Sequence, residues 1–179
     1  MNIKLFIFII LFLVLSTTKA SAFVKSSAYL ATTEGSRAND DRVKTLKAYL
    51  EENNSPLASS AQVFVDSADE YNIDWKLVAA ISGVESTFGQ AIPPASYNAW
   101  GWGVYGDNVI YFSSWDDGIK TISQGIRERY MNERGATNVY EIGSTYATST
   151  TWAQRVEMYM QRIDDYTALN TSDGLSISL

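Results

Sequence analysis

Residues 75–89 read WKLVAAISGVESTFG, and this stretch decides the fold. At about 100° per residue on a helix, one group of apolar side chains falls within roughly 40° of a common direction: Leu77, Ile81, Val84 and Phe88. The pattern predicts a buried helix from Trp75 to about Phe88. Asp74 precedes it and is a good N-cap residue.

Helical spacing of apolar residues continues on both sides of this stretch. The additional helices are expected over residues 41–52, 55–71, 115–135, 139–146 and 151–166. Ser55 followed by Pro56 is a typical helix start, and Ser114 with Asp117 resembles a capping box. The sequence therefore predicts an all-α domain over residues 41–168 with about six helices, followed by a polar tail over residues 169–179.

The first residues have the layout of a secretory signal peptide. A short positive start precedes the apolar run Leu5–Leu15, and small residues follow as far as Ala22. The run is shorter than the roughly 20 residues that a spanning helix needs. We expect a signal peptide over residues 1–22, a flexible leader over residues 23–40, no stable membrane insertion after cleavage, and a secreted, periplasmic or cell-wall-associated protein. The alternative is an uncleaved membrane anchor.

The composition excludes several kinds of chemistry. The 179 residues include 14 basic and 20 acidic side chains, and neither His nor Cys. An acidic chain argues against a non-specific nucleic-acid binder. A sequence without His and Cys lacks the commonest metal ligands and the commonest general base. We therefore expect a monomer without cofactor or metal, whose chemistry depends on carboxylates, hydroxyls and amides.

Glu85 lies on the edge of the apolar stripe, near 80° from Leu77 at about 100° per residue. Partial burial there raises the pKa of a carboxyl group, and the negative end of the helix dipole also opposes its ionisation. A glutamic acid that is protonated near neutral pH is what a glycosidase needs. The alternative is an ordinary boundary glutamate that reaches water or pairs with an arginine.

An aromatic and glycine-rich loop follows the helix. It covers residues 89–106, and its segment 96–105 reads SYNAWGWGVY. Glycines allow the backbone to approach a ligand closely, and aromatic rings offer flat faces on which sugars can stack. Asn98 offers both a donor and an acceptor. The alternative is a small aromatic core beneath the loop. A minimal strand or an extended piece is expected over residues 108–112.

These two features resemble a known family. The segments ESTFG at residues 85–89 and SYNAWG at residues 96–101 are similar to those of bacterial cell-wall glucosaminidases, in which a catalytic Glu ends a helix and a Ser-x-Asn-x-aromatic-Gly loop follows. The Glu-Ser pair also resembles the lytic transglycosylases of the wider lysozyme-like superfamily. The resemblance covers roughly residues 60 to 165 and implies a lysozyme-like helical fold.

The resemblance also implies roles for individual residues. Glu85 would be the general acid, and Tyr146 would assist it, with Tyr97 as the second candidate. The substrate contacts would come from Ser86, Ser96, Tyr97, Asn98, Trp100, Trp102 and Tyr105. The alternative for Tyr146 is a tyrosine of the core. The chain has Ser149-Thr150 where the family has Asp-Pro, and its loop is richer in Trp than the family's loop.

A second carboxylate is not evident in the sequence. The candidates are Asp107, Asp116, Asp117 and Glu141. Asp116 and Asp117 are better explained as first-turn helix acids and Asp107 as a turn residue, and Glu141 lies on a predicted helix with no motif around it. A mechanism with one acid is therefore attractive: the substrate's own N-acetyl or 6-hydroxyl group would act as nucleophile, and Glu85 as acid and then base. The sequence does not choose between hydrolysis and formation of an anhydro-sugar.

The leading hypothesis is an exported glycosidase or lytic transglycosylase acting on a β-1,4-linked N-acetylated glycan, peptidoglycan or chitooligosaccharide-like. The alternatives are a non-catalytic glycan-binding module on the same fold and a helical interaction protein without a sugar site. The basic residues concentrate late in the chain: Lys120, Arg127, Arg129, Arg134, Arg155 and Arg162. On one face they would hold an anionic glycan; otherwise they are solvated helix charges.

Overall fold

The structure is a computed structural model that describes residues 40–103 and 109–173. These residues belong to a compact unit that begins at Asn39. The expected signal peptide at residues 1–22, most of the leader and the end of the tail lie outside the described residues. Tyr105 and Asp107 lie outside them as well.

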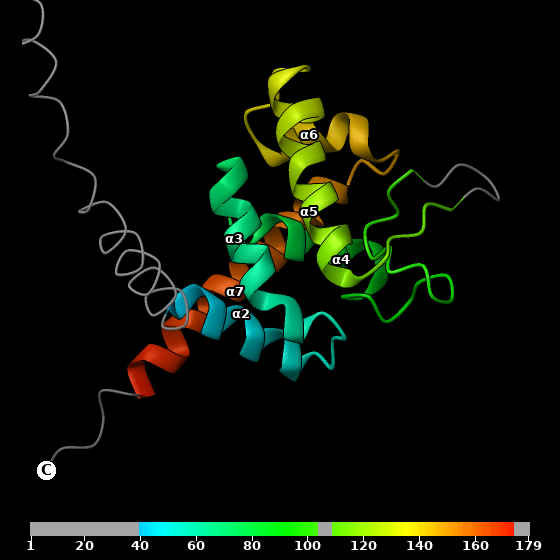
Figure 1. Ribbon diagram of the computed structural model, residues 1–179. Helices are drawn as coiled ribbons and strands as arrows, with labels where there is room; N and C mark the ends of the chain where they lie inside the picture. Colours follow the sequence, from blue (N-terminus) through cyan, green and yellow to red (C-terminus); the bar gives the residue numbers. More distant parts are fainter. Residues whose placement is uncertain (1–39, 104–108, 174–179) are drawn as a thin grey trace, which may run out of the picture. The chain divides into compact units, whose positions relative to one another are not determined.

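The regular elements of the described residues are all helices, which confirms the all-α class (Figure 1). Its elements are α2 (Asp41–Glu52), the 3₁₀-helix η3 (Ala58–Ser60), α3 (Ala61–Tyr71), α4 (Leu77–Ser86), α5 (Trp115–Gly125), the π-helix η4 (Ile126–Asn132), α6 (Val139–Tyr146) and α7 (Trp152–Asp173). The expected minimal strand is absent from residues 109–112. In that extended piece the Phe112 N–H donates to the Ser96 carbonyl oxygen at 2.9 Å.

Several helix boundaries follow from capping side chains. The bounds of α2 and α6 are those expected from the sequence, and Asp40 and Asn138 cap them by accepting bonds from Arg42 N–H and Glu141 N–H. Ser114 caps α5 in the same way, by accepting from Asp117 N–H at 3.2 Å. Each cap satisfies a backbone donor that the first helical turn leaves unpaired.

Other boundaries differ from the expectation. The helix expected as far as Phe88 ends at Ser86, because Thr87 and Phe88 adopt the left-handed conformation with φ of 52° and 57°. The long helix expected after Ser114 is divided into α5 and the π-helix η4. The last helix continues to Asp173, beyond the expected end at Tyr166.

α4 is the centre of the core. It packs against α7, while α3 packs against α5 and α2 contacts both α3 and α7. Almost all of α4 is buried: Leu77, Val78, Ala79, Ala80, Ile81, Ser82, Gly83 and Ser86. The ring of Phe88 folds back over Gly83, where an added Cβ would lie 2.7 Å from it. The buried helix therefore fixes its own C-terminal end, where Glu85 lies.

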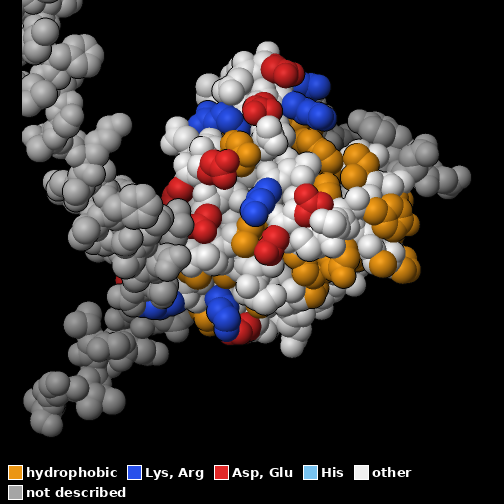
Figure 2. All heavy atoms as spheres, in the orientation of Figure 1, with side chains coloured by type: hydrophobic (Ala, Val, Ile, Leu, Met, Phe, Trp, Pro, Cys, Tyr) orange, Lys and Arg blue, Asp and Glu red, His pale blue; other side chains and the backbone are white. Residues whose placement is uncertain are grey.

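The visible face of the described unit carries mixed charges (Figure 2). Hydrophobic side chains gather on the side where the connection between α4 and α5 lies, and the exposed large residues of that connection are Tyr97, Ile110 and Tyr111. None of the described helices combines the length and apolar character that a membrane span requires.

Candidate active site

The Glu85 carboxyl group joins two helices. Glu85 lies at the C-terminal end of α4, and its Oε1 accepts a hydrogen bond of 2.6 Å from Nε1 of Trp152, the first residue of α7. Trp152 is buried, whereas Glu85 is exposed to solvent. The carboxyl group is thus held in place from the protein side and is open to a ligand from the other side.

Burial is the main influence on the acidity of Glu85. Desolvation raises the pKa of its carboxyl group above 4.5, and this effect exceeds the lowering by the Trp152 hydrogen bond and by the positive charge of Arg155. The residue as a whole is exposed, but the carboxyl group itself lies against protein atoms, which explains the direction of the shift. A raised pKa increases the fraction of the neutral acid that can donate a proton.

Gly101 brings the loop backbone up to the carboxyl group. It has a φ of +60°, and a Cβ added at this position would lie 3.4 Å from Glu85 Oε2. Glycine is favoured here because L-residues rarely adopt this conformation and because the side chain would meet the carboxylate. Loop glycines were expected to let the backbone approach a ligand; at Gly101 the backbone approaches the Glu85 carboxyl group.

Four aromatic residues, which we call the aromatic cluster, extend away from Glu85: Trp152, Tyr146, Trp102 and Tyr130. The Tyr146 and Trp152 rings are stacked, with centroids 4.8 Å apart and an interplanar angle of 24°. Tyr146 also contacts Tyr130 at 5.6 Å and Trp102 at 6.1 Å. The cluster links the loop, η4, α6 and α7 around the candidate acid.

Tyr146 lies near Glu85, but its hydroxyl group is already engaged. The hydroxyl donates to the Trp100 carbonyl oxygen at 2.8 Å. Burial, the negative charge of Glu85 and Tyr130 raise the pKa of Tyr146 well above its usual value of 10, so the phenol stays neutral. The structure thus places Tyr146 beside the acid, where it supports Trp152 by stacking. Its predicted assistance in catalysis remains a prediction.

Three of the predicted substrate-binding side chains are buried and form hydrogen bonds within the protein. Ser86 donates to Ala99 O at 2.7 Å and accepts from Gly89 N–H at 2.9 Å, and Ser96 is fully buried and accepts from Asn98 N–H. The Asn98 amide binds Trp102 N–H, Trp102 O and Ile110 O. These buried side chains shape the loop, and their polar groups are bound to protein atoms.

The loop aromatics divide into buried and accessible rings. Trp100 was expected to contact a sugar, but it is fully buried and its Nε1 donates to Val78 O at 2.9 Å, so its ring belongs to the core. Tyr97 is 36% exposed and contacts Trp115 edge to face. Trp102 is partly exposed. The small-core interpretation therefore applies to Trp100, while contact of Tyr97 and Trp102 with a ligand remains a prediction.

The described candidates for a second carboxylate serve as structural acceptors. Asp116 accepts from the Ser60 hydroxyl at 2.6 Å. Asp117 accepts from Ser113 N–H, and Glu141 accepts from Thr137 N–H; these bonds lower the pKa of both carboxyl groups. Residues 40–103 and 109–173 also contain no group of three or more acidic side chains suited to a metal ion.

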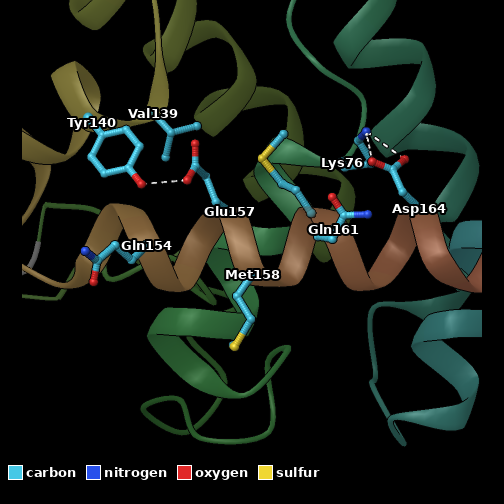
Figure 3. A pocket seen from close by; sticks show the side chains of 9 residues that line it. Lys76, Val139, Tyr140, Gln154, Glu157, Met158, Gln161 and Asp164 are labelled. Atoms are coloured by element: carbon cyan, nitrogen blue, oxygen red, sulfur yellow. Dashed lines mark hydrogen bonds and ion pairs between the residues drawn. The ribbon is translucent and has the colours of Figure 1, made fainter.

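The most distinct hollow on the described surface lies along α7, away from Glu85 (Figure 3). It measures about 630 Å³ and is lined by α7 together with Lys76 and the start of α6. Its polar groups already bind one another: Lys76 pairs with Asp164, and the Tyr140 hydroxyl donates to Glu157. The hollow therefore presents few free polar groups to a ligand.

Sequence reasoning missed three contributors to the site. Trp152 and Tyr130 were not among the predicted site residues, yet Trp152 donates to the acid and the Tyr130 ring contacts Tyr146. Arg155 was noted only among the late basic residues, and its charge lowers the pKa of Glu85.

A search of protein-family models and a search of curated proteins found no match to this chain. The functional assignment therefore depends on the motifs and on the geometry around Glu85.

Proposed function

We propose that this chain is a glycoside-cleaving enzyme of the lysozyme-like kind, acting on a β-1,4-linked N-acetylated glycan, with peptidoglycan as its substrate. One observation carries the proposal. A glutamate at the end of a buried helix is exposed to solvent, is held by the Trp152 indole, and has a pKa raised by burial. This is the environment that a general acid for glycosidic oxygen requires.

The proposed reaction begins with proton transfer from Glu85 to the glycosidic oxygen. The C1–O bond then breaks, and the leaving sugar departs with the transferred proton as its hydroxyl group. The N-acetyl oxygen or the 6-hydroxyl group of the substrate attacks C1, because the described acids near helix starts are already bound to backbone donors. In hydrolysis, water then bonds to C1, the C1–O bond to the N-acetyl oxygen breaks, and the Glu85 carboxylate accepts a proton from that water. In formation of an anhydro-sugar, the 6-hydroxyl oxygen stays bonded to C1 and its proton passes to the Glu85 carboxylate.

The protein contributes position as well as acidity. The Trp152 N–H fixes one carboxyl oxygen, and the Gly101 backbone approaches the other. The stacked Tyr146 ring holds Trp152 in place. A carboxyl group restrained in this way loses little conformational freedom when it meets the substrate, which favours proton transfer.

The test is incubation of the purified protein with peptidoglycan sacculi and mass analysis of the soluble products. We expect release of muropeptides, and the product mass distinguishes an anhydro end from a reducing end by one water. Glu85→Gln should abolish release, while Glu52→Gln, which changes an exposed glutamate of α2, should not. Binding of the glycan without turnover by the wild type would favour a binding module and contradict the proposal.

A further inference from the structure

The structure separates the late basic residues by role. The Arg127 guanidinium donates to the backbone oxygens of Tyr71 and Asn72 and so caps α3. Arg155 donates to Val84 O at 3.3 Å, beside Glu85. Arg129 and Arg134 differ, because each lies over a ring of the aromatic cluster. We call these two residues the arginine pair.

The arginine pair lies on adjacent rings. The Arg129 guanidinium is 5.6 Å from the Trp102 centroid, and the Arg134 guanidinium is 5.3 Å from the Tyr130 centroid. The two rings are 6.2 Å apart, so both cations belong to one surface. Both side chains are exposed, and within the described part of the chain neither forms a salt bridge with an acid.

Guanidinium groups that form no salt bridge with an acid of residues 40–103 and 109–173 are notable in this protein, because acids outnumber bases by 20 to 14. A guanidinium that stacks face-on against a ring keeps its N–H groups at the edge, where they can bind a carboxylate in a bidentate manner. Figure 2 shows Lys and Arg side chains together with Asp and Glu side chains over the part of the described unit where η4 lies.

The local backbone supports this surface. The chain changes from α-helix to π-helix after Gly125, where an added Cβ would lie 2.6 Å from the Trp102 ring. The Glu133 N–H donates to Glu128 O at 2.9 Å, the five-residue spacing of a π-helix. Segments of π-helix are rare and often mark functional sites. Trp102 thus lies against the helix that carries Arg129 and Tyr130.

We propose that the arginine pair binds a carboxylate carried by the glycan, so that the preferred ligand is an anionic, carboxyl-bearing N-acetylated glycan and not a neutral one. The inference rests on the proposed function. The aromatic cluster connects the arginine pair to the acid through Trp102, Tyr146 and Trp152. A glycan chain with its scissile bond at Glu85 would extend toward the partly exposed Trp102 ring and present its substituents to the cations.

Equilibrium binding in the Glu85→Gln background tests the inference, since cleavage is then removed. The ligands are neutral chitooligosaccharide, peptide-free peptidoglycan glycan that carries only lactyl carboxylates, and the same glycan with its stem peptides. The variant is Arg129→Gln/Arg134→Gln. The matched control is Arg162→Gln, because Arg162 also stacks on a tyrosine, Tyr159, at 5.4 Å, outside the aromatic cluster.

We expect the double variant to bind the carboxylated glycans roughly tenfold more weakly, as loss of a charge-assisted contact implies. The double variant should bind the neutral ligand with unchanged affinity. The Arg162→Gln control should bind all three ligands with unchanged affinity. Added salt should weaken wild-type binding of the anionic ligands alone. If the double variant loses affinity for the peptide-free glycan, the lactyl carboxylate is the bound group. If it loses affinity only for the glycan with stem peptides, the peptide carboxylates are the bound groups.

An unchanged ratio of anionic to neutral affinity in the double variant would overturn the inference while leaving the proposed function in place. Absence of binding of all three ligands would overturn both. Arg129→Lys/Arg134→Lys guards against a folding artefact: it retains the charges, so it should keep part of the preference for carboxylated glycan. Equal loss of neutral and anionic binding in both double variants would mean a structural role and would overturn the inference.

Discussion

Trp152 Nε1 lies 2.6 Å from Glu85 Oε1, and this hydrogen bond joins the end of α4 to the start of α7. It ties the candidate acid to the buried interface between these two helices. The bond stabilises the carboxylate form, while burial opposes that form. The pKa of Glu85 therefore depends on the balance between desolvation, which raises it, and the Trp152 hydrogen bond, which lowers it.

Trp152→Phe should shift the pH dependence of activity. The Trp152 hydrogen bond lowers the pKa of Glu85, so its removal should raise that pKa and move the loss of activity at high pH to a higher pH. The pH–rate profile on peptidoglycan measures this shift. Trp100→Phe is the control, since it removes an indole donor to Val78 O in the core and does not touch Glu85. A shift of equal size in both variants would argue against the proposed acid.

Glu85→Gln should change stability with pH in a defined direction. Because the pKa of Glu85 is raised in the folded state, its favourable contribution is fully present below pH 4.5 and is lost as pH rises through the raised pKa. The amide stays neutral and can still accept from Trp152. The melting temperature of the variant relative to the wild type should therefore increase from about pH 4 to about pH 7.

The expected stability change is small, because Glu85 is exposed and solvent screens its charge. Glu52→Gln, on an exposed part of α2, provides the baseline for removal of any carboxylate. If the difference in melting temperature between Glu85→Gln and the wild type does not change with pH, the raised pKa is wrong.

Gly101→Ala should impair activity more than its effect on stability explains. The positive φ makes an L-residue unfavourable by roughly 1–2 kcal/mol, and the new methyl group would meet the Glu85 carboxylate. Gly135→Ala is the matched control, because Gly135 has a φ of +75° and no atom within 4 Å of an added Cβ. Urea unfolding should give similar losses for the two variants, but only Gly101→Ala should lower kcat. Equal activities would show that the close approach has no functional role.

Asn98→Ala should destabilise the loop. The side chain is buried and holds three backbone groups, so its removal should cost about 2–4 kcal/mol at roughly 1 kcal/mol per hydrogen bond plus the unpaired partners. Asn98→Asp should be no better, since a carboxylate would oppose the carbonyl oxygens of Trp102 and Ile110. Chemical denaturation measures both. A loss below about 0.5 kcal/mol, the usual range for surface sites, would contradict the role assigned to Asn98.

Sequence patterns predicted the helices well where local signals act alone. The bounds of α2 and α6 were predicted from the sequence, although their capping residues Asp40 and Asn138 were not. The end of α4 was missed, because Thr87 and Phe88 adopt a left-handed conformation that is rare for such residues. Packing of the Phe88 ring over Gly83 and the hydrogen bond from Phe88 N–H to Ser82 O hold this conformation.

Within the site, the sequence identified Glu85 and the neighbouring tyrosine but not the accessibility of the loop rings. Composition cannot distinguish Trp100, which is buried with its N–H bound to Val78 O, from Trp102, which is partly exposed. The bond from Trp152 to Glu85 spans 67 positions in the chain, and no local pattern predicts such a contact. The positions of Arg129 and Arg134 over aromatic rings could not be predicted either, because they depend on where the fold places Trp102 and Tyr130.

The most direct measurement compares muropeptide release from peptidoglycan by the wild type, Glu85→Gln and Glu52→Gln at equal folded concentration. The account predicts release by the wild type and by Glu52→Gln, and a loss of at least roughly 100-fold in Glu85→Gln, as expected when a general acid is removed. Release by Glu85→Gln at the wild-type rate, or no release by any of the three proteins, would contradict it.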